Sequence, residues 1–150
     1  MTNPQQRIEA HVKEAMKSGQ KERLSTLRML LTDVKNDRIR RGGEVDEAGF
    51  VSLVRKAIKQ REEAADQYRK GARPELADKE EREAGLLAVY LPAQVDEAAI
   101  RAAVEQLVAE RGLAGPAAMG VVMKETLARF GSSADGAAVS RIAREVLAGR

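Results

Sequence analysis

Hydrophobic residues recur every three or four positions along most of the chain, which is the period of an α-helix, and no segment shows the strict alternation of a β-strand. The first helix is predicted to begin at Pro4, because Asn3 can cap it and Gln6 can complete a capping box. We expect it to run to Ser18 and to end at Gly19. Its expected apolar face consists of Ile8, Val12, Ala15 and Met16.

Two longer helices are predicted to follow. One covers residues 21–41 and ends at a glycine pair, and the next begins at an Asp46 cap and ends at Gly71. Residues 61–70 in this third helix are highly charged and have a narrow apolar stripe, so we expect them to project beyond the bundle or to pack loosely. The expected apolar stripes are Leu24, Leu27, Leu31 and Val34 in the second helix, and Phe50, Leu53, Val54, Ala57, Ile58, Ala64, Ala65 and Tyr68 in the third.

A fourth helix is predicted to begin at Pro74 and to stop before Pro92, because proline cannot continue a helix. The helical pattern then restarts in a shorter, more alanine-rich form. We therefore place a domain boundary here, with an N-terminal helical domain over residues 1–92 and a C-terminal domain over residues 93–150.

Three short helices are predicted in the C-terminal domain. Asp96 caps the first, Pro116 starts the second, and Ser133 or Asp135 caps the third. Gly120 lies inside the second, where glycine costs about 1 kcal/mol relative to alanine, so we expect a neighbouring helix backbone or, alternatively, a phosphate backbone to approach it closely. The predicted fold class is all-α, with an N-terminal bundle of about four helices followed by a small three-helix module.

Composition limits the classes of protein to which the chain can belong. It is 43% hydrophobic and contains no cysteine, so disulfides, thiolate nucleophiles and cysteine-ligated metals are excluded. No apolar run approaches the roughly 20 residues needed to span a bilayer, and the first residues lack the apolar stretch of a secretion signal. We expect a cytoplasmic protein with no membrane contact.

Positive charge is concentrated in the first part of the chain. Residues 1–61 contain 14 Lys or Arg against 8 Asp or Glu, whereas residues 93–150 contain 7 of each. Such a bias suits an anionic partner such as RNA, although a solvated helix surface has a similar composition. The candidate RNA-binding residues on the second helix are Arg28, Lys35 and Arg38, and the third helix has a similar basic group at Arg55, Lys56 and Lys59.

Catalytic chemistry has little support in the sequence. His11 is the single histidine and is interpreted as a surface or boundary residue, and Ser25 and Thr26 lie inside a helix without a recognisable base. Adjacent carboxylates such as Glu62 and Glu63 point to different faces of a helix, and no metal-ligand spacing occurs. We therefore predict no catalytic residue, no metal site and no cofactor.

Several motifs follow one another in a fixed order. In the C-terminal part they are Tyr90-Leu91-Pro92, Asp96-Glu97-Ala98-Ala99-Ile100, Met119-Gly120-x-x-Met123, Ala134-Asp135-Gly136 and Ile142-Ala143-Arg144-Glu145-Val146-Leu147. In the N-terminal part they are Lys21–Leu30, Lys59–Glu62, Tyr68–Leu76 and Lys79-Glu80-Glu81. Together they resemble the stand-alone proteins of the GatB/YqeY family, whose C-terminal module is shared with the B subunit of glutamine-dependent tRNA amidotransferases. The catalytic region of that subunit has no counterpart here.

The resemblance implies that the C-terminal module contacts tRNA. The residues of this module that could meet phosphates are Lys124, Arg129, Arg141 and Arg144. Relatives often carry basic residues around the Ala-Asp-Gly turn, whereas residues 131–138 here contain none, so the resemblance implies a weak and salt-sensitive contact.

These observations favour a non-catalytic helical module that binds tRNA or a tRNA-handling protein. The partners implied by the resemblance are tRNA and proteins of the aminoacyl-tRNA or amidotransferase machinery. One alternative is an accessory component of a carbon–nitrogen ligase that takes its amide nitrogen from glutamine. Another is a protein–protein adaptor that uses the long third helix and contacts no RNA.

Overall fold

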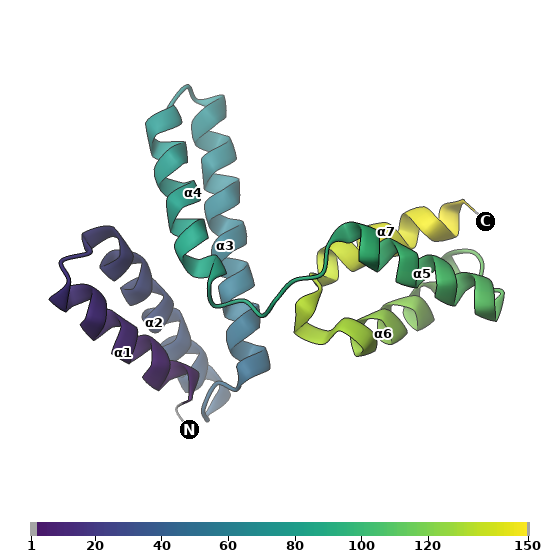
Figure 1. Cartoon of the computed structure of the whole chain (residues 1–150), viewed down its shortest axis with the longest axis horizontal. Coiled ribbons are helices and arrows are strands. Elements are labelled where there is room, and N and C mark those ends of the chain that lie inside the picture. Colours follow the sequence, from purple (N-terminus) through teal and green to yellow (C-terminus); the bar gives the residue numbers. More distant parts are fainter. Residues whose placement is uncertain (1–2, 150) are drawn as a thin grey trace. The chain divides into compact units, whose positions relative to one another are not determined.

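The computed structural model describes residues 3–149, which are almost entirely helical and contain no strand (Figure 1). The α-helices of the first part are α1 (Pro4–Lys17), α2 (Lys21–Arg41), α3 (Glu47–Lys70) and α4 (Pro74–Ala88). The second part contains α5 (Glu97–Arg111), the 3-10 turn η1 (Pro116–Ala118), α6 (Met119–Phe130), the 3-10 turn η2 (Gly131–Ser133) and α7 (Gly136–Ala148). The all-α prediction is therefore confirmed.

Helix ends follow the capping residues closely. The Asn3 side chain accepts a hydrogen bond from the Gln6 amide, and the Gln6 side chain accepts one from the Asn3 amide, which completes the expected capping box. The Asp46 and Asp96 carboxylates cap α3 and α5 by accepting hydrogen bonds from the amides of Gly49 and Ala99, without a reciprocal bond. Of the two candidates for the last helix, Asp135 is the cap. Pro116 opens a single 3-10 turn, and α6 begins only at Met119.

The chain divides into two compact units, one ending at Leu91 and the other beginning at Pro92. Each unit has its own hydrophobic core, and the two cores share no residue. None of the helices among residues 3–149 is long and apolar enough to cross a bilayer.

Two helical hairpins make up the first unit. Helix α1 packs along α2, α3 packs along α4, and α2 contacts both helices of the second hairpin. Their shared core consists of Ile8, Val12, Ala15, Leu27, Leu30, Val34, Val45, Phe50, Val54, Ala57 and Leu87. The prediction that Met16 belongs to this face is wrong, because Met16 is 53% exposed. It follows Ala15 directly and so lies about 100° further around the helix.

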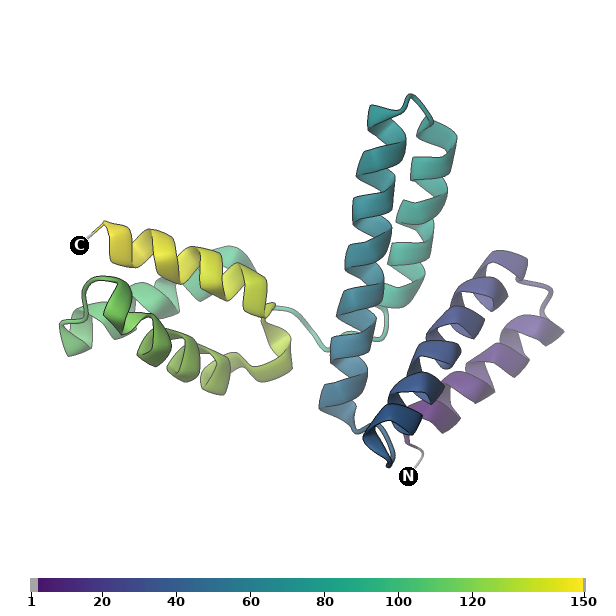
Figure 2. The same cartoon turned by 180° about the vertical axis from the view of Figure 1, so that it is seen from behind.

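The α3–α4 arm (residues 61–83) extends beyond this core. Both views show the ends of α3 and α4 that meet at the 71–73 turn rising away from α1 and α2 (Figures 1 and 2). The small side chains of Ala65 and Ala77 are buried along the arm, while Tyr68 is half-buried. The charged second half of α3 therefore projects from the bundle, in agreement with the first of the two expectations.

Helices α5, α6 and α7 enclose the core of the second unit. The buried residues are Ile100, Val104, Val108, Ala118, Val122, Ala134, Val139, Ile142, Ala143 and Leu147. The expectation that a neighbouring helix packs closely on Gly120 is wrong. This glycine is exposed on α6, and a Cβ atom built on it meets no atom within 4 Å.

Candidate nucleic-acid interface

The outer face of α2 carries three cations in one line. Lys21, Arg28 and Lys35 are seven residues apart, which is nearly two helical turns, so their side chains point the same way at intervals of about 10 Å. All three are exposed, and no described residue forms an ion pair with them. The hydroxyl residues Ser25 and Thr32 lie between them on the same face. We call this surface, formed by residues 21, 25, 28, 32 and 35, the α2 basic face.

Acidic side chains of α2 lie on other sides of the helix. Glu22 accepts a hydrogen bond from Arg82 of α4, with a distance of 3.0 Å between Nε and Oε1. Asp37 is buried and pairs with Arg40 and, through a 2.6 Å contact, with Nε of Arg41. Asp33, the third acidic residue of α2, is exposed and lies about 140° around the helix from Arg28, so no carboxylate lies within the α2 basic face itself.

Arg38, the third residue predicted on this helix, points toward α1. Its Nη1 lies 3.5 Å from Oε1 of Gln5, and with Lys35 and Ile39 it lines a shallow hollow beside the glycine turn that ends α2. Arg38 thus borders the α2 basic face and extends it toward the C-terminal end of the helix.

In the second unit, Arg141 is held by acidic residues. It forms ion pairs with Glu97 and Glu145, and Arg101 pairs with the same Glu145. Hydrogen bonds from Arg101 and then the charge of Arg141 hold the pKa of Glu145 below its ordinary value, and the Glu97 carboxylate raises the pKa of Arg141. The positive charge of Arg141 is therefore compensated within the unit.

The other predicted residues of the second unit do not gather into one site. Arg144 donates a 3.1 Å hydrogen bond to the Ser140 hydroxyl, and the Arg129 guanidinium lies 5.3 Å from the centre of the Phe130 ring. Lys124 is exposed and has no ion-pair partner among the described residues. Lys124 and Arg129 are five residues apart on α6 and so face different sides of the helix.

The single histidine of the sequence contacts a tyrosine in the first unit. Nδ1 of His11 lies 2.7 Å from the Tyr90 hydroxyl, and burial raises the pKa of Tyr90. The Thr26 hydroxyl is buried and has no partner, while Ser25 is exposed on the α2 basic face. Among residues 3–149 no group of three or more acidic or histidine side chains is placed to hold a metal ion.

Lys21 was not among the predicted binding residues. The signal that identifies it is its spacing, because residues 21, 28 and 35 are seven positions apart. Of the two partners of Arg141, Glu145 is four residues further along the same helix and could have been found from that spacing, whereas Glu97 is 44 residues away in the chain.

Comparison with known proteins places the chain in a family. Over residues 5–147 it matches the model of the Yqey-like proteins. It is also 32% identical over 90 residues to an uncharacterized protein of Schizosaccharomyces pombe, an alignment that takes in 60% of this chain and 73% of the yeast protein. The match covers both compact units, so the chain belongs to the family of Yqey-like proteins.

Proposed function

We propose that this protein is a non-catalytic module that binds structured RNA, with tRNA as the class of ligand, and that the α2 basic face is its main contact. The observation that carries the proposal is the line of three exposed cations, Lys21, Arg28 and Lys35, without an acidic partner. The two compact units act as separate domains in this proposal, and Lys124 and Arg144 of the second unit provide additional phosphate contacts.

The geometry of the α2 basic face suits a nucleic-acid backbone. Three cations spread over about 20 Å of helix can each approach a different phosphate. The Ser25 hydroxyl lies between them and can donate a further hydrogen bond to a phosphate or sugar oxygen, whereas the Thr32 hydroxyl already donates to the Arg28 carbonyl. With few aromatic side chains in the sequence to stack on bases, recognition depends on backbone and shape.

A binding titration against bulk tRNA at several salt concentrations tests this proposal. In the test variant, Lys21, Arg28 and Lys35 are all changed to Gln, and in the matched control the exposed lysines Lys13, Lys17 and Lys79 are changed to Gln. Each phosphate contact contributes somewhat less than one unit to the slope of log K against log salt. We expect the test variant to lose about 2 to 3 units of slope and the control to lose less than one.

The outcomes separate the proposal from its rivals. The proposal is overturned if the unmodified protein does not bind tRNA even at low salt. If the test and control variants lose the same amount of salt slope, the α2 basic face is not the contact surface. Hydrolysis of glutamine by the purified protein alone would contradict the non-catalytic part. A protein partner that binds equally well to both triple variants, together with no RNA binding, would indicate an adaptor.

A further inference from the structure

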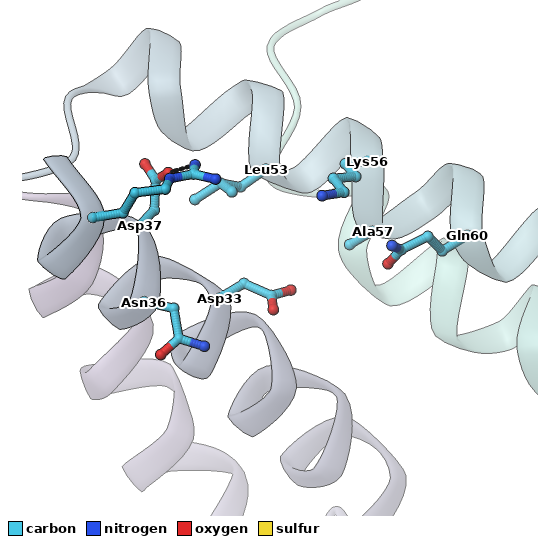
Figure 3. Close-up of a pocket in the computed structure, with 8 residues that line it drawn as sticks. Asp33, Asn36, Asp37, Leu53, Lys56, Ala57 and Gln60 are labelled. Carbon is cyan, nitrogen blue, oxygen red and sulfur yellow. Dashed lines mark hydrogen bonds and ion pairs between the residues drawn. The ribbon is translucent and has the colours of Figure 1, made fainter.

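A small hollow lies between α2 and α3, on a different side of α2 from the basic face. It measures about 220 Å³ and is open to solvent on one side (Figure 3). Polar side chains from both helices line it, namely Asp33, Asn36 and Arg40 from α2 and Lys56 and Gln60 from α3. Leu53 and Ala57 of α3 form its apolar part.

Two opposite charges in this hollow do not compensate each other. The Asp33 carboxylate is contributed by α2 and the Lys56 ammonium group by α3, and neither forms an ion pair or a hydrogen bond with a described residue. Asp37 differs, because it is buried and both of its oxygens are engaged by Arg40 and Arg41. The hollow therefore presents one uncompensated anion and one uncompensated cation from opposite walls.

Two amide side chains add donors and acceptors to the same space. Those of Asn36 and Gln60 line the hollow from opposite helices, and no hydrogen bond engages either side chain among the described residues (Figure 3). Since about 10 to 15 Å³ of such space is enough for one water molecule, the hollow has room for a small polar solute.

We propose that this hollow binds a free α-amino acid or another zwitterion of that size. Its ammonium group pairs with Asp33, its carboxylate pairs with Lys56, and Asn36 and Gln60 hydrogen-bond to its polar atoms. A phosphate group could pair with Lys56 but would leave the Asp33 carboxylate without a partner, whereas a zwitterion pairs with both. Ligand and RNA thus occupy different faces of α2, and this proposal does not depend on RNA binding.

Calorimetry and thermal denaturation with the 20 common amino acids test the proposal on nuclease-treated protein. We expect at least one amino acid to bind and to raise Tm. For that amino acid, the N-acetyl form lacks the ammonium charge and the amide form lacks the carboxylate. Each form should bind about 10- to 100-fold more weakly, because each leaves one wall of the hollow without its partner.

Charge-removing variants locate the site. Asp33→Asn and Lys56→Gln should each weaken binding about 10- to 100-fold, whereas Asp66→Asn and Lys59→Gln, which change exposed charges of α3 outside the hollow, should not. The double variant Asp33→Lys with Lys56→Asp exchanges the two charges. It should recover part of the affinity, because a zwitterion can bind in the reverse direction.

The proposal has two clear points of failure. It is overturned if none of the amino acids binds the unmodified protein at millimolar concentration. It is also overturned if the hollow variants and the control variants weaken binding alike, because the ligand would then occupy another place. Backbone amide shifts at Asn36 and Ala57 on addition of the amino acid would support the hollow as the site, and shifts confined to other helices would contradict it.

Discussion

Gly120 is the second residue of α6, in its first turn, with open space where a side chain would begin. Glycine loses more backbone entropy than alanine on entering a helix, and no neighbouring atom would obstruct a methyl group at this position. Because the position is in the first turn and not in the helix interior, we expect Gly120→Ala to raise the free energy of unfolding by no more than about 0.5 kcal/mol, as measured by urea denaturation.

Gly112 provides the matched control for this substitution. It ends α5 with a φ of +62°, a left-handed conformation that strains residues with a side chain. Gly112→Ala should therefore lower stability by about 1 kcal/mol. If Gly120→Ala raises stability but weakens tRNA binding, the glycine is retained for an external contact. A loss of stability in Gly120→Ala would contradict the open environment of this residue.

The pKa of Glu145 gives a second residue-scale prediction. Arg101 and Arg141 favour the charged carboxylate, so its folded pKa lies below the ordinary value of 4.5. This group therefore stabilises the fold above its unfolded pKa, and the contribution is lost as the pH falls through the lower folded pKa. We expect Arg101→Gln to raise the pKa of Glu145 toward 4.5, as measured by carboxyl NMR titration. Arg111→Gln removes the partner of Glu125 instead and should leave the pKa of Glu145 unchanged.

At the scale of helices, one buried ion pair joins α3 to α4. Nε of Arg61 lies 3.3 Å from Oε2 of Glu83, and both side chains are largely buried. Nη1 of Arg61 also donates to the Ala57 carbonyl, and Nη2 lies 3.6 Å from the Met29 sulfur of α2. The base of the α3–α4 arm is thus held by a charged side chain that contacts three helices.

A double-mutant cycle tests this contact. Arg61→Leu and Glu83→Leu should each lower stability by about 3 kcal/mol, because each leaves one buried charge without a partner. The double variant should lose much less than the sum, since it removes both charges together. Arg69→Gln removes two exposed ion pairs further along the arm and should cost less than about 1 kcal/mol, because exposed pairs contribute little. Additive losses in the cycle would show that the two side chains do not interact.

Helix ends were easier to predict than helix faces. Asn3, Asp46 and Asp96 cap the starts of their helices through hydrogen bonds that depend only on neighbouring residues, so the sequence indicates these starts. The burial of Arg61 is not a local property, because it depends on Glu83 and Met29 arriving from two other helices. The apolar period therefore predicted the core stripe of α3 but not the charged residue beside it.

On the scale of the whole molecule, the two compact units have separate cores. Ile142 is fully buried in the second core, so Ile142→Ala should destabilise that unit by about 2 to 5 kcal/mol. If the units unfold independently, hydrogen exchange should accelerate from Pro92 onward and stay unchanged up to Leu91. Leu87→Ala in the first core should give the reverse pattern. Equal acceleration in both units would show that they unfold together.

Candidate site residues could be predicted as a group where they share one helix, but not where the group spans two helices. Arg28 and Lys35 belong to one face because of their spacing along a single helix, which the sequence displays. The compensation of Arg141 by Glu97 depends on α5 and α7 lying side by side. In the same way, Asp33 and Lys56 line one hollow only because α2 packs against α3. Such pairings arise from tertiary packing, which periodicity does not specify.

The two tyrosines have a practical consequence for experiments. Tyr68 and Tyr90 both belong to the unit that ends at Leu91, and the sequence contains no tryptophan. Intrinsic fluorescence therefore reports on the first unit alone, whereas far-ultraviolet circular dichroism sums the helices of both. Once both unfolding curves are normalised, the difference between the dichroism curve and the fluorescence curve reports on the second unit without any label. Phe130→Tyr would give that unit a fluorescence signal of its own.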